Sequence, residues 1–356
     1  MGFLSIEVSG TPEEMGSAYG SQAKEQIMKA AAFYKKFITE KSGRSWDDIS
    51  KLIDSDIIPS LSSNYSEYFE EMKAISASSG VPLQEVVAIN VRSELSFGLF
   101  KIENKDNTSD GCTSMTCVSD KYAMSGQNWD WIDDAYEFTI ILKLNPINKP
   151  SCVMVAEAGM IGKIGMNEYG VGCLINALRV SGYNYQALPV NIAARKILES
   201  ATAKEAVKYV VSKGLACSVN YMVCDKDYSC AIEATAYDTV VIERNSMGHV
   251  YHTNHTIKDH DSRGYEPFFV PDSAPRLSQI EQAAQKAPDS SFQSLDKFFE
   301  FFSDTSNSPL SVCKFSIPES PAHTLCTVTM DHNAKIVRFR FGMPCDPSKG
   351  DFEFKY

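Results

Sequence analysis

The chain has 356 residues, of which 45 are Asp or Glu and 34 are Lys or Arg, so its formal charge is −11 at pH 7. This length suits one large domain or two domains of ordinary size. Nucleic-acid-binding proteins usually carry a basic face. An acidic chain without a run of Lys and Arg is therefore not expected to bind nucleic acid.

The two ends of the chain carry no targeting pattern. Met1–Glu7 contains neither a basic stretch nor a long apolar one, so it predicts no signal peptide and no membrane span. Glu353–Tyr356 differs from the Ser-Lys-Leu peroxisomal signal. The ten cysteines are scattered, and several lie in apolar segments, as buried reduced thiols do. We therefore expect a cytoplasmic protein without a membrane partner.

The first hundred residues predict helices. Thr11 and Glu14 have the spacing of a capping box at the start of the first helix. Further helices are expected over about 66–78 and 82–96. Residues 103–110 contain no apolar side chain, which predicts an exposed loop that is open to cleavage.

The later residues alternate between strands and helices. Strands are expected over 113–118, 122–129, 138–144, 152–156, 171–175, 220–223, 229–233, 239–243, 250–253, 324–330 and 335–341. Helices are expected over about 188–199, 203–213, 275–286 and 293–302. This order predicts an α+β fold, in which helices cover the sheets, rather than regular βαβ units.

Gly111 and Cys112 stand where the polar segment meets the first of these strands. If the peptide bond between them is broken, Cys112 carries a thiol and a free α-amino group, which are a nucleophile and its own base. Such an amine titrates at about 7.7–8, so part of it can accept a proton at neutral pH. The alternative is that Cys112 merely packs within a strand.

Four segments stand in an order and approximate spacing typical of one family. They are 10–16 (Gly-Thr-Pro-Glu-Glu-Met-Gly), 126–130 (Gly-Gln-Asn-Trp-Asp), 157–165 (Glu-Ala-Gly-Met-Ile-Gly-Lys-Ile-Gly) and 252–255 (His-Thr-Asn-His). In these segments the chain resembles the acyl-CoA:6-aminopenicillanate (isopenicillin N) acyltransferases, cysteine members of the N-terminal-nucleophile (Ntn) hydrolase superfamily.

The resemblance implies an Ntn-hydrolase αββα sandwich with a helical N-terminal segment. It also implies cleavage between Gly111 and Cys112. Residues 1–111 would form a helical pro-segment, or α-subunit, and residues 112–356 a catalytic β-subunit. The two would remain one intertwined domain, an α/β heterodimer made from one precursor.

Three residues form the candidate catalytic set. Cys112 is the nucleophile. Asp130 ends a strand that can pair with the one beginning at Cys112, where a carboxylate would orient the new amino terminus and assist cleavage. Asp130 could instead cap the turn before Trp131. The resemblance implies that Asn254 donates to the oxyanion, a task that suits an uncharged amide.

Further residues are candidates for binding the substrate. Trp129, Trp131, Met160 and Ile161 could line an apolar acyl pocket or belong to the core, and Ser218 is a weaker candidate. The glycines of 159–165 fit neither a P-loop nor a dinucleotide fingerprint. They predict a tight hairpin or backbone close to the substrate.

Histidines near Asn254 leave two alternatives. His252 and His255 lack further ligands at suitable spacing, so we predict neither a metal nor a cofactor, although acyl-CoA is a possible co-substrate. In one alternative, His252, His255 or His323 activates Cys112 without chain cleavage. In the other, the chain is an inactive family member that acts as a binding protein.

One departure from the family concerns the substrate. Penicillin-forming relatives carry an Arg-Gly-Ala-Thr-Leu-like stretch where residues 321–325 of this chain read Pro-Ala-His-Thr-Leu. A basic group that could hold a substrate carboxylate is therefore missing. The resemblance implies a self-processing acyltransferase or amidohydrolase that acts on small amides through a thioester on Cys112, whereas the missing arginine argues against penicillin formation.

Overall fold

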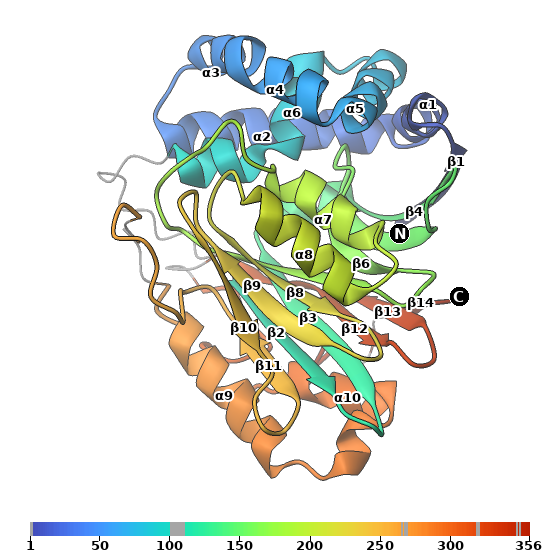
Figure 1. The fold of residues 1–356 in the computed structure, drawn as a ribbon, viewed down its shortest axis with the longest axis vertical. Helices are drawn as coiled ribbons and strands as arrows, with labels where there is room; N and C mark the ends of the chain where they lie inside the picture. Colours follow the sequence, from blue (N-terminus) through green and yellow to red (C-terminus); the bar gives the residue numbers. More distant parts are fainter. Residues whose placement is uncertain are drawn as a thin grey trace.

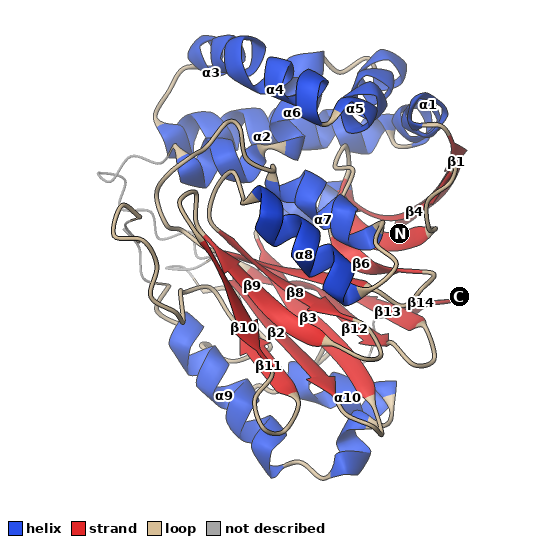
Figure 2. Ribbon diagram, in the orientation of Figure 1, coloured by secondary structure: helices blue, strands red, loops and turns tan. Residues whose placement is uncertain are grey.

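Two β-sheets lie face to face in the computed structural model, and helices cover the outer side of each (Figures 1 and 2). The structure describes residues 3–99, 111–264, 266, 270–317, 321–346, 348 and 350–356. The predicted loop 103–110 lies outside these residues. The four layers form an αββα sandwich, which confirms the predicted fold class.

The N-terminal part is helical apart from one strand. Its helices are α1 (Pro12–Gln22), α2 (Lys24–Ser42), α3 (Trp46–Leu52), α4 (Ile58–Asn64), α5 (Ser66–Ser79) and α6 (Leu83–Asn90), with π-helical turns η1 (Ile53–Ile57) and η2 (Glu94–Gly98). The capping box of α1 is confirmed. Thr11 Oγ1 accepts the Glu14 N–H at 3.3 Å, and Glu14 Oε2 accepts the Thr11 N–H at 2.8 Å.

The first sheet has eight strands in the order β1-β4-β5-β6-β7-β8-β9-β10. They are β1 (Leu4–Gly10), β4 (Thr139–Pro146), β5 (Cys152–Glu157), β6 (Ile164–Asn167), β7 (Gly172–Ala177), β8 (Val219–Cys224), β9 (Ser229–Ala234) and β10 (Thr239–Glu243). Strand β1 pairs in parallel with β4, from Leu4 opposite Ile140 to Gly10 opposite Pro146. The sequence did not predict β1, so the N-terminal segment is not purely helical.

The second sheet has six strands in the order β11-β2-β3-β12-β13-β14. They are β2 (Gly111–Val118), β3 (Ala123–Trp131), β11 (His249–His252), β12 (His323–Asp331), β13 (Ile336–Phe341) and β14 (Asp351–Lys355). Every residue of β2 and β3 is buried, because the first sheet covers one face of these strands and helices cover the other.

Four later helices complete the outer layers, two on each sheet. On the first sheet, α7 (Val190–Leu198) and α8 (Ala203–Lys213) contact β6, β7, β8 and β9. On the second, α9 (Ser273–Lys286) and α10 (Leu295–Glu300) contact β2, β3, β11 and β12. Short 3₁₀ turns stand at η3 (Asp133–Phe138), η4 (Asp289–Phe292) and η5 (Phe301–Ser303).

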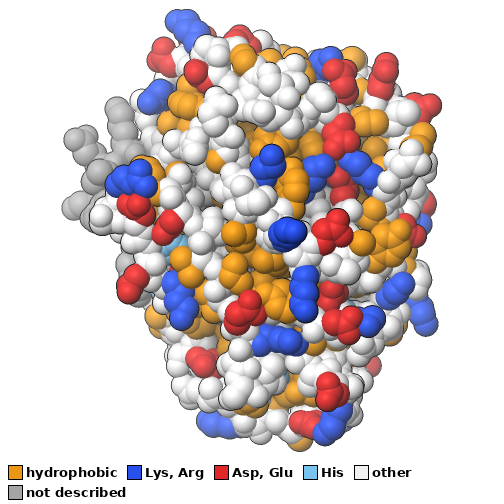
Figure 3. All heavy atoms as spheres, viewed as in Figure 1, with side chains coloured by type: hydrophobic (Ala, Val, Ile, Leu, Met, Phe, Trp, Pro, Cys, Tyr) orange, Lys and Arg blue, Asp and Glu red, His pale blue; other side chains and the backbone are white. Residues whose placement is uncertain are grey.

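The outer surface is mixed in charge. On the face seen in Figure 3, acidic and basic side chains are interspersed, so no single-sign field covers it. Within the described residues, every helix is too short or too polar to cross a lipid bilayer.

The glycine-rich segment after β5 packs tightly against helix α7. A Cβ atom at Gly162 would contact the Asn191 carbonyl oxygen and would lie 2.6 Å from the Arg195 nitrogen. Both atoms belong to the helix backbone and cannot rotate away. Gly162 therefore allows a close approach of loop and helix, which favours the structural interpretation of these glycines.

We predict that Gly162→Ala lowers the free energy of unfolding by about 1–3 kcal/mol, the usual cost of overpacking. Thermal unfolding of the purified protein measures this effect. Gly350→Ala is the control, because a Cβ there would have no described atom within 4 Å. Equal melting temperatures for the two variants would contradict the packing argument.

Candidate active site

Cys112 lies at the start of strand β2, which stands between β11 and β3 in the second sheet. It stands opposite Trp129 of β3, and Gly111 stands opposite Asp130. The Cys112 side chain is buried, with 5% of its surface exposed. Pairing with β3 therefore brings two of the predicted catalytic residues, Cys112 and Asp130, to one end of the sheet.

Asn254 joins them from the segment that follows β11. Its Oδ1 accepts the backbone N–H of Cys112 at 2.7 Å, and its Nδ2 donates to the Ala177 carbonyl at 3.1 Å. Its own backbone N–H donates to Ser273 Oγ at 2.8 Å. The nitrogen that would become the new amino terminus is thus held by the side chain of Asn254.

Arg276 of helix α9 is a central residue that the sequence prediction missed. One guanidinium nitrogen donates to the Cys112 carbonyl at 2.7 Å, and another donates to Asn254 Oδ1 at 2.9 Å. Asp272, one turn earlier, accepts from Arg276 Nε at 3.0 Å. Burial alone would raise the pKa of Asp272, but Arg276 and Lys314 lower it to about 2, so this counter-ion stays charged.

Asp130 has one oxygen bound and one that faces Gly111. Its Oδ1 accepts the hydroxyl of Thr324 at 2.6 Å, whereas Oδ2 is buried without a hydrogen-bond partner among the described residues. A Cβ at Gly111 would lie 2.7 Å from that Oδ2. Burial raises the pKa of Asp130 against the opposing charges of Arg276 and Lys314. A side chain at position 111 would therefore have to displace this carboxylate oxygen.

A narrow cavity of about 40 Å³ reaches Cys112 from between the sheets. Among the described residues, its walls are Arg92, Ser93, Phe97, Cys112, Trp129, Asp130, Trp131, Lys163, Ile164, Ile175, Ala177, Val190, Asn191, Ser218 and Val219. Both predicted fragments supply wall residues. Three of the five predicted substrate-binding residues, Trp129, Trp131 and Ser218, lie here.

Two cations in the cavity wall share one buried carboxylate. Lys163 forms an ion pair with Glu157 and lies 3.5 Å from the centroid of the Trp129 ring. Arg92 lies 3.5 Å from the same carboxylate and above the ring of Trp131. Burial lowers the pKa of Lys163 to about 8, while the two cations together lower the pKa of Glu157 despite its burial.

Other predicted residues lie away from this cavity. Met160 and Ile161 are fully buried in the main core, and neither is part of the cavity wall. Their backbone groups bind Tyr19 and Asn90 instead, so the structure assigns both to packing. Of the two alternatives that the sequence left open for these residues, an acyl pocket and the core, their positions favour the core.

The three histidines that the sequence offered as alternative activators of Cys112 also lie away from the cavity. His252 Nδ1 bonds the Thr253 carbonyl, and His255 Nδ1 lies 2.7 Å from Ser273 Oγ. His323 faces Asp133 at 3.3 Å. None of the three is in the cavity wall. Among the described residues, no group of three or more His, Cys, Asp or Glu side chains could hold a metal ion.

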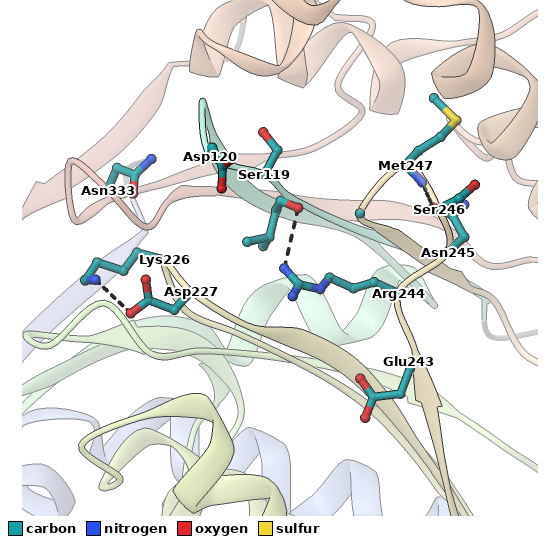
Figure 4. Close-up of a pocket in the computed structure, with 12 residues that line it drawn as sticks. Ser119, Asp120, Lys226, Asp227, Glu243, Arg244, Asn245, Ser246, Met247 and Asn333 are labelled. Carbon is teal, nitrogen blue, oxygen red and sulfur yellow. Dashed lines mark hydrogen bonds and ion pairs between the residues drawn. The ribbon is translucent and has the colours of Figure 1, made fainter.

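A larger groove of about 870 Å³ lies at the other end of strand β2, beside Val118 (Figure 4). Several of its polar side chains already form ion pairs or hydrogen bonds with other residues of the protein. Lys226 pairs with Asp227 at 2.7 Å, and Arg244 bonds the Val118 carbonyl. Size alone would favour this groove. The narrow cavity is the better candidate, because it contains a nucleophile, a carboxylate and cations at one place.

Comparison with known proteins identifies the family. Residues 117–346 match the sequence profile of the family described as acyl-coenzyme A:6-aminopenicillanic acid acyl-transferase. The chain is also 30% identical, over 349 residues, to the acyl-coenzyme A:6-aminopenicillanic-acid-acyltransferase 40 kDa form of Emericella nidulans. That match covers 97% of this chain and 94% of the relative. The chain belongs to this acyltransferase family.

The matched range 117–346 spans Asp130 and Asn254, and Cys112 lies five residues before it. Among solved structures, penicillin V acylase from Agrobacterium tumefaciens is similar with a TM-score of 0.43 and 14% identity. That similarity covers 68% of this chain and 86% of the other. The family resemblance found in the sequence is thereby confirmed by the profile and by the curated relative.

Glu94 supports the cavity wall from behind and provides a pH test. Its Oε1 accepts the N–H of Val190 at 2.7 Å, and its Oε2 has no partner among the described residues. Burial raises the pKa of Glu94 from 4.5 to about 7. A folded-state pKa above the unfolded value means that stability is full below about pH 4.5 and is lost as pH rises through 7.

We predict that Glu94→Gln removes this pH-dependent loss of stability, because glutamine does not titrate but keeps an oxygen that accepts the N–H of Val190. The variant should gain stability relative to the natural protein between pH 5 and 8, by at most about 3 kcal/mol. Denaturant unfolding across this pH range measures the difference, with exposed Glu70→Gln as the control. A stability difference that is flat with pH would show that Glu94 is charged in the folded protein.

Proposed function

We propose that the chain is a self-processing cysteine acyltransferase or amidohydrolase that forms an acyl-thioester on Cys112. The observation that carries this proposal is the 2.7 Å contact between the Cys112 nitrogen and Asn254 Oδ1, beside the cavity. A nitrogen held in this way needs little rearrangement to serve as a free amine once the preceding bond is broken.

The cleavage step would use the groups around Gly111. The Cys112 thiol gives its proton to Asp130, whose unpartnered Oδ2 faces Gly111, and the sulfur attacks the Gly111 carbonyl carbon. The carbon–nitrogen bond then breaks, and the Cys112 nitrogen takes up a proton. Water hydrolyses the resulting thioester, which leaves residues 1–111 and 112–356 as separate chains.

Turnover would use the amine that cleavage creates. The α-amino group of Cys112 accepts the thiol proton, and the thiolate attacks the acyl carbon of the substrate. Asn254 Nδ2, which already donates to Ala177, has a second N–H for the oxyanion. The leaving amine takes up the proton, and water or another amine then resolves the thioester.

Two features of the cavity and one of the sequence bear on the substrate and its reaction. Its volume of about 40 Å³ and its aromatic walls suit a short apolar acyl group. The cations Lys163 and Arg92 stabilise negative charge near Cys112, where thiolate and oxyanion develop. Pro321 replaces the arginine of the penicillin-forming relatives, so we propose small amides as substrates. Acyl-CoA is a possible acyl donor, as the family description suggests.

We predict that the natural protein runs as two fragments under denaturing conditions, with masses of residues 1–111 and 112–356. Cys112→Ala should stay uncut and inactive, whereas Cys112→Ser should cut slowly, because a hydroxyl is a weaker nucleophile. Intact mass and amide hydrolysis are the measurements. Cys117→Ala, which removes another buried thiol from β2, is the matched control.

Full activity in an uncut chain would reject self-processing but leave Cys112 as nucleophile. Full activity of Cys112→Ala would show that another residue is the nucleophile.

A second prediction separates the two roles of Asn254. Asn254→Asp keeps an oxygen for the Cys112 nitrogen and Arg276 but loses the N–H donor. If the donor stabilises the oxyanion, kcat should fall by about 10²–10³ with little change in KM. Steady-state kinetics on the processed enzyme measure this, with exposed Asn64→Asp as the control. Unchanged kcat in Asn254→Asp would restrict Asn254 to holding the nitrogen.

A further inference from the structure

Two cysteines outside the candidate active site lie within reach of each other. Cys313 Sγ is 3.2 Å from Cys345 Sγ, although the residues are 32 positions apart in the sequence. Both are free thiols in the structure. Cys313 follows the Ser311–Val312 segment behind β3, and Cys345 lies in the turn after β13. The function proposed above uses neither thiol.

The two thiols differ in access to solvent. Cys345 is partly exposed, whereas the other nine cysteines of the chain, including Cys313, are buried. Burial also raises the pKa of the Cys313 thiol, which keeps it protonated at neutral pH. An oxidant from solvent therefore meets Cys345 first, and Cys313 stands directly behind it.

We propose that Cys313 and Cys345 are a redox-modification site, which a peroxide converts into a reversible disulfide. The Cys345 thiol gives up its proton, and its sulfur attacks one oxygen of hydrogen peroxide. The O–O bond breaks, and the departing hydroxide takes up that proton, so that a sulfenic acid and one water form. The Cys313 sulfur then attacks the Cys345 sulfur. The S–S bond forms, the S–O bond breaks, and a second water leaves with the Cys313 proton.

The disulfide would fix the segment that supports the active site. Next to Cys313, the backbone N–H of Lys314 donates to Thr324 Oγ1 at 3.0 Å, and Thr324 donates to Asp130. The Lys314 ammonium lies 2.9 Å from Asp272, the counter-ion of Arg276. Oxidation therefore joins this segment covalently to the turn after β13. It adds a constraint behind Asp130 without touching Cys112.

The test is peroxide treatment followed by denaturation, alkylation and peptide mass mapping. Because Cys112 is itself a peroxide target in the proposed mechanism, the experiment is run on the natural protein and on Cys112→Ser. In both we expect one peptide pair that joins Cys313 to Cys345, which dithiothreitol removes. The oxidised form should melt about 3–6 °C higher than the reduced form.

Cys345→Ser is the matched variant, and its partly exposed position makes normal folding expected. It should lose the cross-linked peptide and the dithiothreitol-sensitive rise in melting temperature, while its reduced form melts as the natural protein does. The proposal is overturned if both thiols are fully alkylated after peroxide. It is also overturned if Cys345 ends as a sulfinic acid beside a free Cys313, or if Cys345 links two copies of the chain.

Discussion

The candidate site depends on one buried cation, the guanidinium of Arg276. It binds the Cys112 carbonyl, the Asn254 side chain and the Thr113 hydroxyl at the same time. A buried charge of this kind is stable only with a counter-ion, here Asp272, and losing one partner of such a pair usually costs about 3–5 kcal/mol. Only the planar fork of arginine can bind several oxygens in fixed directions. The relative positions of Cys112 and the Asn254 amide are therefore set by a residue of helix α9.

The fold was largely predictable because its elements carry strong local patterns. The helix expected over 203–213 matches α8 (Ala203–Lys213), which has Thr202 as its N-cap and Gly214 beyond its end. Strands β1, β6 and β14 were missed, the first two for different reasons. Leu4–Gly10 directly precedes a long run of helical patterns, and its partner β4 begins more than a hundred residues later. Ile164–Asn167 contains a glycine and follows others, which favoured a loop.

The site was predictable only where a motif marked it. Asp130 and Asn254 stand in segments typical of the family, and the structure brings both to Cys112. Arg276 stands in a helix whose pattern is not unusual, and only tertiary packing shows that it is buried. The spacing of four residues between Asp272 and Arg276 was the available signal, since it places both charges on one helix face.

The long sequence separations within the site have a consequence for synthesis. Asn254 and Arg276 follow Cys112 by 142 and 164 residues, and Thr324 follows Asp130 by 194. A nascent chain emerging from the ribosome N-terminus first therefore lacks the surroundings of the Gly111–Cys112 bond until nearly all of it has been translated. If the protein cleaves this bond itself, cleavage must wait until these late residues have been made. The first fragment is then cut from the second only after β1 has paired with β4.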